Sequence, residues 1–241
     1  MIAANEEKIC KVLAADFGTR HSIESRLLEF QMIYQACKHV RKHLKEWMKP
    51  QLVATPGFLG SSHAWTQMQS MGVAGIISPW NYPLAIFMGQ VVGALASGHV
   101  VVAKPAEQTP HIACYAAKLL HKAGVPVEVL QLVYGDWEVG SWLCSYPAVD
   151  TVLFTGSNAA AKHIHASLLN RDCLQSLPLL IAETGGQNAM VVDSSALLEQ
   201  VVGDALESAF GSAGQRCSAL RLLCVQRDVA DRVFTMLDGT V

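Results

Sequence analysis

The stretch VAGIISPWNYPLAIFMGQVVGALASGHVVVAK, residues 73–104, decides the fold. It opens with a short β-branched run, Val73–Ile77, passes through a polar turn into the apolar segment Leu84–Ala96, and ends in a second β-branched run, Val100–Lys104. We interpret these runs as a strand, a helix and a second strand. Prolines, an asparagine and several glycines interrupt the apolar stretch, so it does not have the pattern of a membrane-spanning helix.

The same alternation of short β-branched runs and helix-length segments continues toward the end of the chain. Further strands are expected at Val129–Val133, Thr151–Phe154, Leu179–Ala182, Met190–Val192 and Leu220–Val225. Further helices are expected at Pro110–Ala123, from Glu138, and at Asn158–Leu169, Ala196–Phe210 and Asp228–Leu237. This alternation predicts an α/β fold whose parallel sheet is covered by helices on both faces.

The chain before residue 72 has a different pattern. Apolar side chains recur at close to a helical period over Glu24–Met48, and Pro50 ends this predicted helix. Pro, Gly and Ser between Gln51 and Met71 favour extended segments with turns. The predicted organisation is a helical part over residues 1–50, an extended arm or hairpin over 51–71, an α/β domain over 72–184, and the start of a second α/β domain over 185–241.

Composition limits the classes of function. Of the 241 residues, 51% are apolar, which suits one large domain or one domain with part of a second. The net charge of -2 gives no reason to expect nucleic acid or an anionic membrane as a partner. The seven cysteines are odd in number and form no CxxC pair, and the N-terminus lacks the apolar core of a secretory signal. We therefore expect a cytoplasmic protein without a disulfide framework.

Polar or glycine-rich residues follow five successive predicted strands. These exits are Ser78-Pro79-Trp80-Asn81-Tyr82-Pro83, Ala103-Lys104-Pro105-Ala106-Glu107, Tyr134-Gly135-Asp136, Thr155-Gly156-Ser157 and Glu183-Thr184-Gly185-Gly186. One such exit is ordinary loop chemistry. Because parallel sheets bind ligands at the carboxyl ends of their strands, five together indicate a lined cleft.

Two of these exits carry groups suited to a nucleotide. Thr155-Gly156-Ser157 opens a helix, whose free N–H groups could hold a phosphate, although Ser157 is more simply read as an N-cap. Lys104 and Glu107 offer a donor and an acceptor for ribose hydroxyls, but residues of these types are more often surface groups. The dinucleotide signature GxGxxG is absent, so an ordinary Rossmann domain is not supported.

Three residues could carry the chemistry. Cys217 lies among small residues, and the neighbouring Arg216 could favour its thiolate, although most cysteines simply pack in the interior. Glu183 leaves a strand that we expect to be buried, where burial would raise the pKa of its carboxyl and suit a general base. Asn81 could donate an amide N–H to an oxyanion. His39 and His43 lie four residues apart without a nearby third ligand, so no metal site is predicted.

The order and spacing of these motifs resemble the aldehyde dehydrogenase superfamily over about three quarters of the chain. Residues from Pro79 to Met236 are most similar to the L-glutamate γ-semialdehyde (1-pyrroline-5-carboxylate) dehydrogenase half of bifunctional proline-utilization proteins. The N-terminal runs ADFGTRHSIESRLLEF and HVRKHLKEWMKP instead resemble coniferyl-aldehyde dehydrogenases.

The resemblance implies a mechanism and a cofactor. A Cys217 thiolate would attack the aldehyde, Asn81 and the Cys217 backbone N–H would hold the oxyanion, and Glu183 would activate water to release the acid. Glu107 near the ribose would favour NAD over NADP. The residues expected to bind NAD are Ile77, Ser78, Pro79, Trp80, Lys104, Ala106, Glu107, Gly135, Phe154, Thr155, Gly156, Ser157 and Gly185. A homo-oligomer is the state implied for the family.

Two departures from the family pattern leave alternatives open. Trp137 stands where the family often has a second glycine, which would alter the adenine side of the site. Val241 lies 24 residues after Cys217, whereas the resemblance implies a longer catalytic domain with an oligomerisation strand. The alternatives are therefore a truncated, non-enzymatic chain that binds nucleotide or another chain, and an enzyme acting on an aromatic aldehyde.

Overall fold

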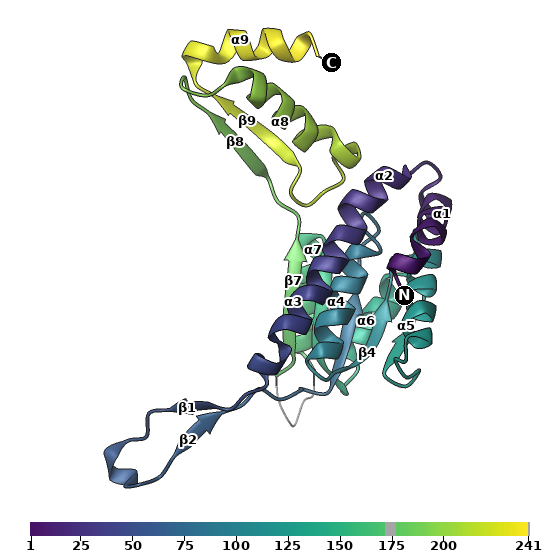
Figure 1. Ribbon diagram of the computed structural model, residues 1–241, viewed down its shortest axis with the longest axis vertical. Coiled ribbons are helices and arrows are strands. Elements are labelled where there is room, and N and C mark those ends of the chain that lie inside the picture. The colour runs from purple at the N-terminus through teal and green to yellow at the C-terminus, as the bar shows by residue number, and fades with distance from the viewer. Residues whose placement is uncertain (172–176, 241) are drawn as a thin grey trace. The chain divides into compact units, whose positions relative to one another are not determined.

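A five-stranded sheet organises the first part of the molecule (Figure 1). In the computed structural model, which describes residues 1–171 and 177–240, the chain divides into two units, Met1–Glu183 and Thr184–Val241. The sheet belongs to the first unit and has the order β5-β4-β3-β6-β7. Its strands are β3 (Val73–Ile77), β4 (Val100–Lys104), β5 (Leu130–Leu132), β6 (Val149–Gly156) and β7 (Leu179–Thr184).

Parallel pairing runs through the centre of this sheet. Strand β3 pairs in parallel with β4 and with β6, and β4 pairs in parallel with β5. The chain adds β4 and β5 on one side of β3 and then crosses to the other side for β6. This change of direction creates a topological switch point between β3 and β6, where α/β sheets hold their ligands outside the carboxyl ends of the strands.

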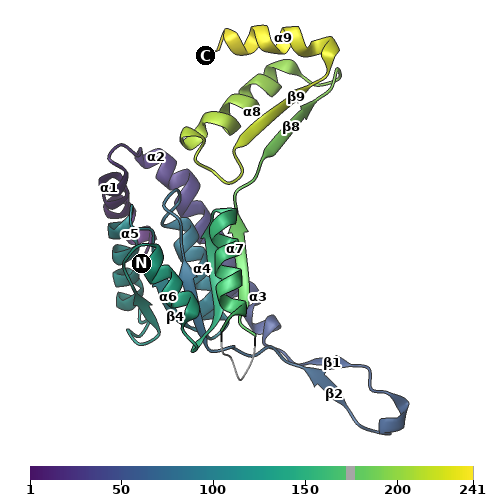
Figure 2. The same cartoon turned by 180° about the vertical axis from the view of Figure 1, so that it is seen from behind.

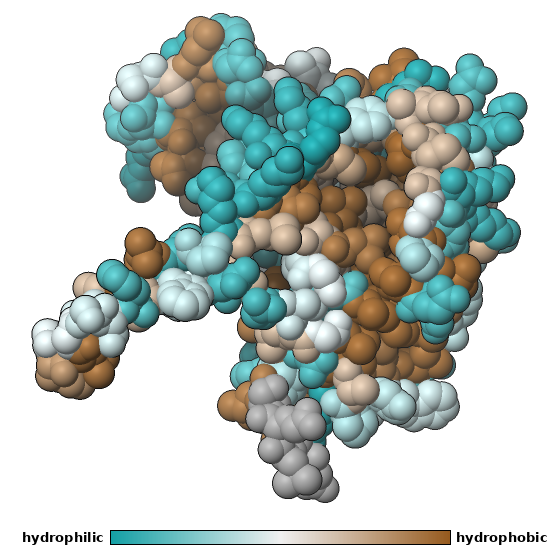
Figure 3. All heavy atoms as spheres, turned by 60° about the horizontal axis from the view of Figure 1, so that its bottom comes forward, coloured by the Kyte–Doolittle hydropathy of each residue, from teal (hydrophilic) through white to brown (hydrophobic). Residues whose placement is uncertain are grey.

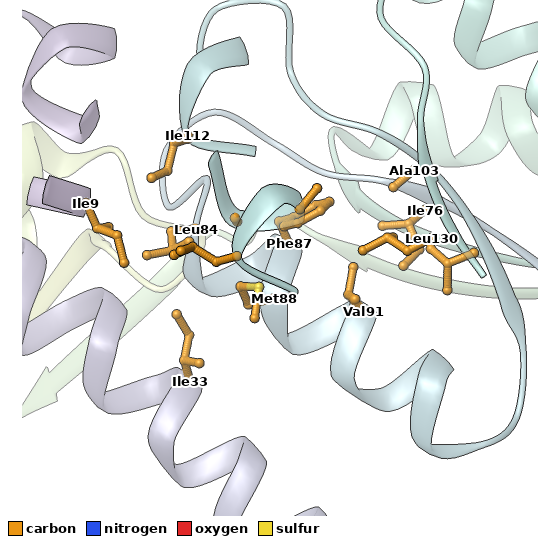
Figure 4. Close-up of a cluster of buried hydrophobic side chains, with 14 of the residues drawn as sticks. Ile9, Ile33, Ile76, Leu84, Phe87, Met88, Val91, Ala103, Ile112 and Leu130 are labelled. Atoms are coloured by element: carbon orange, nitrogen blue, oxygen red, sulfur yellow. The ribbon is translucent and has the colours of Figure 1, made fainter. Parts of the chain in front are cut away.

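Helices cover both faces of the sheet, as the sequence predicted (Figures 1 and 2). Ala74 and Ile76 pack into a core with residues of α1, α3, α4 and α5, whereas Val73 and Ile77 pack against residues of α6 and α7. Figure 4 shows the first cluster, in which Phe87 and Val91 of α4 lie toward Ile76 of the sheet, whereas Leu84, the residue before α4, lies toward Ile9. The alternation along β3 follows from the two-residue period of a strand.

The helices of the first unit agree with the sequence, apart from a local change of winding. They are α1 (Glu6–Phe17), α2 (Ser22–Ser25), α3 (Gln31–Trp47), α4 (Ala85–Ala96), α5 (Pro110–Lys122), α6 (Trp137–Ser145) and α7 (Asn158–Leu169). A short 3-10 segment, η1 (Ala3–Asn5), precedes α1. The single helix predicted for residues 24–48 is interrupted by a π-helical turn, η2 (Arg26–Phe30), which inserts an extra residue into the helical winding.

An antiparallel arm, residues 51–66, projects from the rest of the first unit (Figures 1 and 2). Strands β1 (Gln51–Val53) and β2 (Ala64–Thr66) pair with each other, and η3 (Gly57–Leu59) lies between them. The arm exposes large apolar side chains, including Leu52, Phe58 and Trp65, and brown hydrophobic residues are visible at its end in Figure 3.

The second unit has its own small core. Strand β8 (Asn188–Val192) pairs in parallel with β9 (Leu220–Val225), and the connection runs through α8 (Leu198–Phe210) and η4 (Gly211–Gly214). Helix α9 (Arg227–Asp238) follows β9. Val192, Leu198, Val229 and Val233 are buried between these elements. Across both units, the described helices are too short or too polar to cross a bilayer.

Candidate functional site

A glutamine links the two strand exits at the switch point. The Ser78 hydroxyl donates to Gln90 Oε1 at 2.9 Å, and Gln90 Nε2 donates to Thr155 Oγ1 at 3.1 Å. Ser78 follows β3, Thr155 lies near the end of β6, and Gln90 belongs to α4. Gln90 was not among the predicted site residues, although a polar side chain in the apolar segment of α4 is a signal that could have identified it.

Lys104 and Glu107 form an ion pair after β4. The Lys104 side chain is only 6% exposed, and its ammonium donates to Glu107 Oε2 at 3.1 Å and to the Pro105 carbonyl at 3.4 Å. Partial burial opposes ionisation of Glu107, but its own backbone N–H and the Lys104 ammonium outweigh burial and lower the pKa of its carboxyl. Since half of the Glu107 side chain is exposed, the pair presents a charged acceptor to solvent.

The exit of β6 combines a helix cap with a required glycine. The Ser157 hydroxyl oxygen accepts from Ala160 N at 3.1 Å, so Ser157 is the N-cap of α7, the simpler of its two interpretations. A Cβ atom on Gly156 would lie 2.4 Å from Cζ of Phe154, so a side chain there would force the buried ring to shift. Gly156 therefore allows the Phe154 ring to pack beneath the turn.

The exit of β5 leads into α6 with a similar turn. Gly135 has a φ of +150°, and a Cβ there would lie 2.3 Å from Cγ2 of Val139. Asp136 caps α6 by accepting from Glu138 N at 2.9 Å. Trp137, which departs from the family pattern, is 72% exposed at the first residue of α6. A broad aromatic surface is thus available beside this exit.

The remaining predicted cofactor residues differ in exposure. Ile77 and Pro79 are half-buried, Trp80 is exposed and Ala106 is buried. A Cβ on Gly185 would meet no atom within 4 Å in the structure, so no steric reason for glycine is visible there.

The turn that carries Asn81 is anchored by residues that the sequence did not indicate. Arg20 Nη1 donates to the Asn81 carbonyl at 2.9 Å. Glu29 Oε2 accepts from Leu84 N at 2.9 Å and from Ala85 N at 2.7 Å. These contacts fix the backbone on both sides of the turn between β3 and α4.

The surroundings of Glu183 differ from those predicted. It lies in β7, whose residues are mostly exposed, and its own side chain is exposed. The prediction that Glu183 leaves a buried strand is therefore wrong, because β7 is the edge strand of this sheet. An exposed carboxylate at this position has access to water.

Cys217 lies in the connection between α8 and β9, residues 211–219, which includes the short turn η4 and is called the cysteine loop here. Ser212 and Ala213 both have a φ of +54°, in the left-handed region that non-glycine residues rarely adopt. Gly214 follows with a φ of +68°, and a Cβ there would lie 2.7 Å from the Ala209 carbonyl oxygen. Strain of this kind persists only where surrounding contacts enforce it, and it is frequent at functional sites. Cys217 itself is exposed, so it is not a buried packing residue.

Three side chains of the second unit hold this cysteine loop. Asn188 Nδ2 donates to the Cys217 carbonyl at 2.7 Å and to the Ala219 carbonyl at 3.0 Å. Arg221 Nη2 donates to the Gly214 carbonyl at 2.7 Å. Arg216 donates to the Glu207 and Ser208 carbonyls near the end of α8, at 2.9 and 3.0 Å. Arg216 thus caps the carboxyl end of α8, and its proposed influence on the Cys217 thiolate stays a prediction.

The first unit brings together the predicted residues after β3, β4 and β6. Cys217 belongs to the second unit, whereas Asn81 and Glu183 belong to the first. Their assembly around one substrate is part of the proposal below. Within residues 1–171 and 177–240, no three His, Cys, Asp or Glu side chains gather to hold a metal ion.

The class of the protein follows from comparison with known families. A model of the aldehyde dehydrogenase family matches residues 1–240, and the chain belongs to this family. The bifunctional protein PutA of Klebsiella aerogenes is 56% identical over 173 residues, which are 71% of this chain and 13% of PutA. The 1-pyrroline-5-carboxylate dehydrogenase of Geobacillus thermodenitrificans is 41% identical over 68% of this chain and 32% of its own length. The predicted resemblance to proline-utilization proteins is confirmed.

Two further comparisons bear on the fold and the N-terminal part. The coniferyl aldehyde dehydrogenase of Pseudomonas sp. is 33% identical over 91% of this chain and 44% of its own length. A crystal structure of a mutant proline utilization A from Bradyrhizobium japonicum matches with a TM-score of 0.88 and 44% identity, over 96% of this chain and 23% of that chain. The α/β fold class is confirmed, and this chain spans less than half the length of each of these relatives.

Proposed function

We propose that this chain is the cofactor-binding part, with the cysteine loop, of an NAD-dependent aldehyde dehydrogenase that oxidises L-glutamate γ-semialdehyde to L-glutamate. The observation that carries the proposal is the exposed Cys217 on a strained loop in a member of this family. The substrate rests on the names of two relatives, proline-utilization protein PutA and 1-pyrroline-5-carboxylate dehydrogenase. We also retain the predictions of a cytoplasmic location and a homo-oligomer.

The residues at the carboxyl edge of the sheet fit a nicotinamide dinucleotide. The Lys104–Glu107 pair offers both a donor and an acceptor to ribose hydroxyls. The Ser157 hydroxyl accepts from Ala160 N, and its own proton remains available to a pyrophosphate oxygen at the start of α7. Ile77, Ser78, Pro79 and Trp80 line the nicotinamide side in this proposal. When bound, the nicotinamide ring accepts the hydride that leaves the substrate carbon.

The proposed chemistry begins at Cys217. Its thiolate forms a bond to the aldehyde carbon, and the carbonyl electrons move onto the oxygen. The Asn81 side-chain N–H and the Cys217 backbone N–H donate to that oxyanion. Loss of hydride from the carbon restores the carbonyl and leaves a thioester on Cys217.

Release of the acid depends on Glu183 in this proposal. Its carboxylate takes a proton from a water molecule as the water oxygen bonds to the thioester carbon. The carbon–sulfur bond then breaks, the electrons return to the sulfur, and the carboxylic acid leaves. The exposure of Glu183 supports this role because the base must reach water.

NADH formation by the 241-residue chain with L-glutamate γ-semialdehyde and NAD+ tests the proposal. We expect Cys217→Ala to reduce the rate by about 10³-fold or more, because the covalent route is lost. Cys224→Ala is the matched control, since Cys224 is also exposed and lies in the same unit. A Cys217→Ala variant as active as the control would rule out the covalent mechanism. Calorimetric NAD+ binding without NADH formation would instead indicate a nucleotide-binding fragment.

An aromatic aldehyde is the second candidate substrate. It is favoured by the similarity to coniferyl aldehyde dehydrogenase, which extends over 91% of this chain. Comparing kcat/KM for coniferyl aldehyde and for the semialdehyde under the same conditions separates the two. A larger value for the aromatic substrate would replace the semialdehyde in the proposal.

A further inference from the structure

A buried ion pair lies beside the turn that carries Asn81. The Glu29 side chain is fully buried in η2, the Arg20 side chain is 4% exposed, and Arg20 Nη1 lies 3.0 Å from Glu29 Oε1. Taking two charges out of water is costly, and apolar residues often stabilise a fold as well as such a pair does. A gain in stability is therefore a weak explanation for keeping this pair buried.

Glu29 caps a helix that lies 55 residues further along the chain. Leu84 precedes α4 and provides no side-chain cap of its own. Glu29 Oε2 accepts from Leu84 N and Ala85 N, which are among the otherwise unpaired N–H groups at the start of α4. A negative charge at this end also interacts favourably with the helix dipole. Burial raises the pKa of Glu29, and Arg20 and the two N–H groups oppose this shift.

Arg20 fixes the other end of the turn. Its Nη1 donates to the Asn81 carbonyl at 2.9 Å, and its guanidinium carbon lies 4.7 Å from the Phe17 ring centre and 5.0 Å from the Tyr82 ring centre. The guanidinium thus contacts the backbone of Asn81 and the side chain of the next residue. Together with Glu29, it restrains the chain from Asn81 to Ala85.

We propose that Arg20 and Glu29 are positioning residues, which hold the Asn81 amide where it can donate to the substrate oxyanion. This inference rests on the proposed function, in which Asn81 contacts the oxyanion. The π-helical turn η2 brings Glu29 to the start of α4, and such turns often occur at functional sites. A loosened turn would leave the cofactor residues after β4 and β6 in place, and it would misplace a donor needed in the transition state.

The test uses substitutions that remove the pair without leaving a buried charge. The double variant Arg20→Met with Glu29→Gln keeps side chains of similar size and an acceptor for the α4 N–H groups. Arg20→Lys keeps the charge and serves as the conservative rescue. Lys49→Met is the matched control, because it removes an ion pair with Glu46 that is largely exposed and lies outside η2.

Two measurements on the 241-residue chain test the positioning role of Arg20 and Glu29. In the double variant we expect amide hydrogen exchange over residues 81–86 to rise about tenfold, with little change in the rest of the first unit, including the cofactor residues 77–80. We expect kcat for NADH formation to fall by about 10²-fold, with the KM for NAD+ changing less than about twofold. Arg20→Lys should recover part of kcat, and Lys49→Met should leave both readouts unchanged.

Unchanged exchange over residues 81–86 would overturn the proposal. A uniform rise in exchange across the first unit would also overturn it, and so would a parallel change in kcat and in the KM for NAD+. Either result would show that Arg20 and Glu29 only stabilise the fold. The exchange readout needs no turnover. If the unsubstituted chain forms no NADH, its proposed activity fails, while exchange still shows whether Arg20 and Glu29 hold the turn.

Discussion

At the scale of a single residue, the proposed function makes Glu107 the group that sets the choice between NAD and NADP. Lys104 is nearly buried and has Glu107 as its charged partner, so the carboxylate is held in place before any ligand arrives. A carboxylate beside a ribose accepts a hydrogen bond from the 2′-hydroxyl and repels a 2′-phosphate. The lowered pKa of Glu107 keeps this charge present at neutral pH.

We therefore predict that Glu107→Gln weakens NAD+ binding by about tenfold, because a charge-assisted hydrogen bond is lost. NADP+ binding should weaken less or improve, since the repulsion of the 2′-phosphate is removed. Isothermal titration calorimetry with both nucleotides measures the ratio, and Glu128→Gln is the control because Glu128 is exposed after α5, away from the strand exits. An unchanged ratio of the two affinities would exclude Glu107 from the ribose site.

At the scale of an element, the cysteine loop is a strained segment held by side chains of its own unit. Two non-glycine residues in succession, Ser212 and Ala213, have a left-handed backbone. Asn188 supports the other end of the loop by donating to two of its carbonyls. Local strain and compensating contacts of this kind give a loop one defined conformation.

Asn188→Asp tests that support, because aspartate has nearly the same shape but cannot donate from the side chain. We expect the free energy of unfolding of the second unit to fall by about 1–3 kcal/mol, since two carbonyls lose their donor and face a carboxylate. Hydrogen exchange of the β8 and β9 amides, measured as a function of urea concentration, gives this change in the free energy of unfolding. Asn158→Asp, at the exposed start of α7, should have little effect; equal losses in both variants would contradict a specific role for Asn188.

The helices and strands were largely predictable from the sequence, whereas the hydrogen bonds and ion pairs between distant elements were not. Strands β3, β4 and β9 have the predicted bounds, because each is a β-branched or apolar run between clear turn signals. The π turn was missed because one extra residue barely disturbs a helical period over a long segment. Arg20 and Asn81 lie 61 residues apart, and no local sequence pattern predicts the hydrogen bond between them. The roles of Cys217, Glu183 and Asn81 came from the family motifs and remain predictions.

At the scale of the whole molecule, separate cores support the two faces of the main sheet. Cys144 is buried in the cluster that joins α6 and α7 to the sheet, and it is 1% exposed. Burial raises the pKa of its thiol from 9.0 to about 11, an effect that the neighbouring Arg171 partly opposes. The folded state therefore disfavours the thiolate more than the unfolded state does.

This shift predicts a loss of stability at alkaline pH. The contribution of the neutral thiol is fully present below pH 9.0 and is lost as the pH rises through the folded-state pKa of about 11. The loss should be about 2 kcal/mol by pH 11, given about 1.4 kcal/mol for each pKa unit. Denaturant unfolding between pH 8 and 11 should show a steeper decline for the unsubstituted chain than for Cys144→Ala. If both decline equally, ionisation of Cys144 does not control alkaline stability; Cys224→Ala should behave like the unsubstituted chain.

The cap that Glu29 places on α4 has a consequence for how the chain can be dissected. A shortened version starting at residue 31 would retain every strand of the main sheet and every family motif from Ser78 onward. It would nevertheless lack both charged groups that restrain the turn after β3, and α4 would begin with unsatisfied N–H groups in an apolar setting. We therefore expect residues 1–30 to be needed for the first unit to fold, although the proposed catalytic and cofactor residues all lie after them.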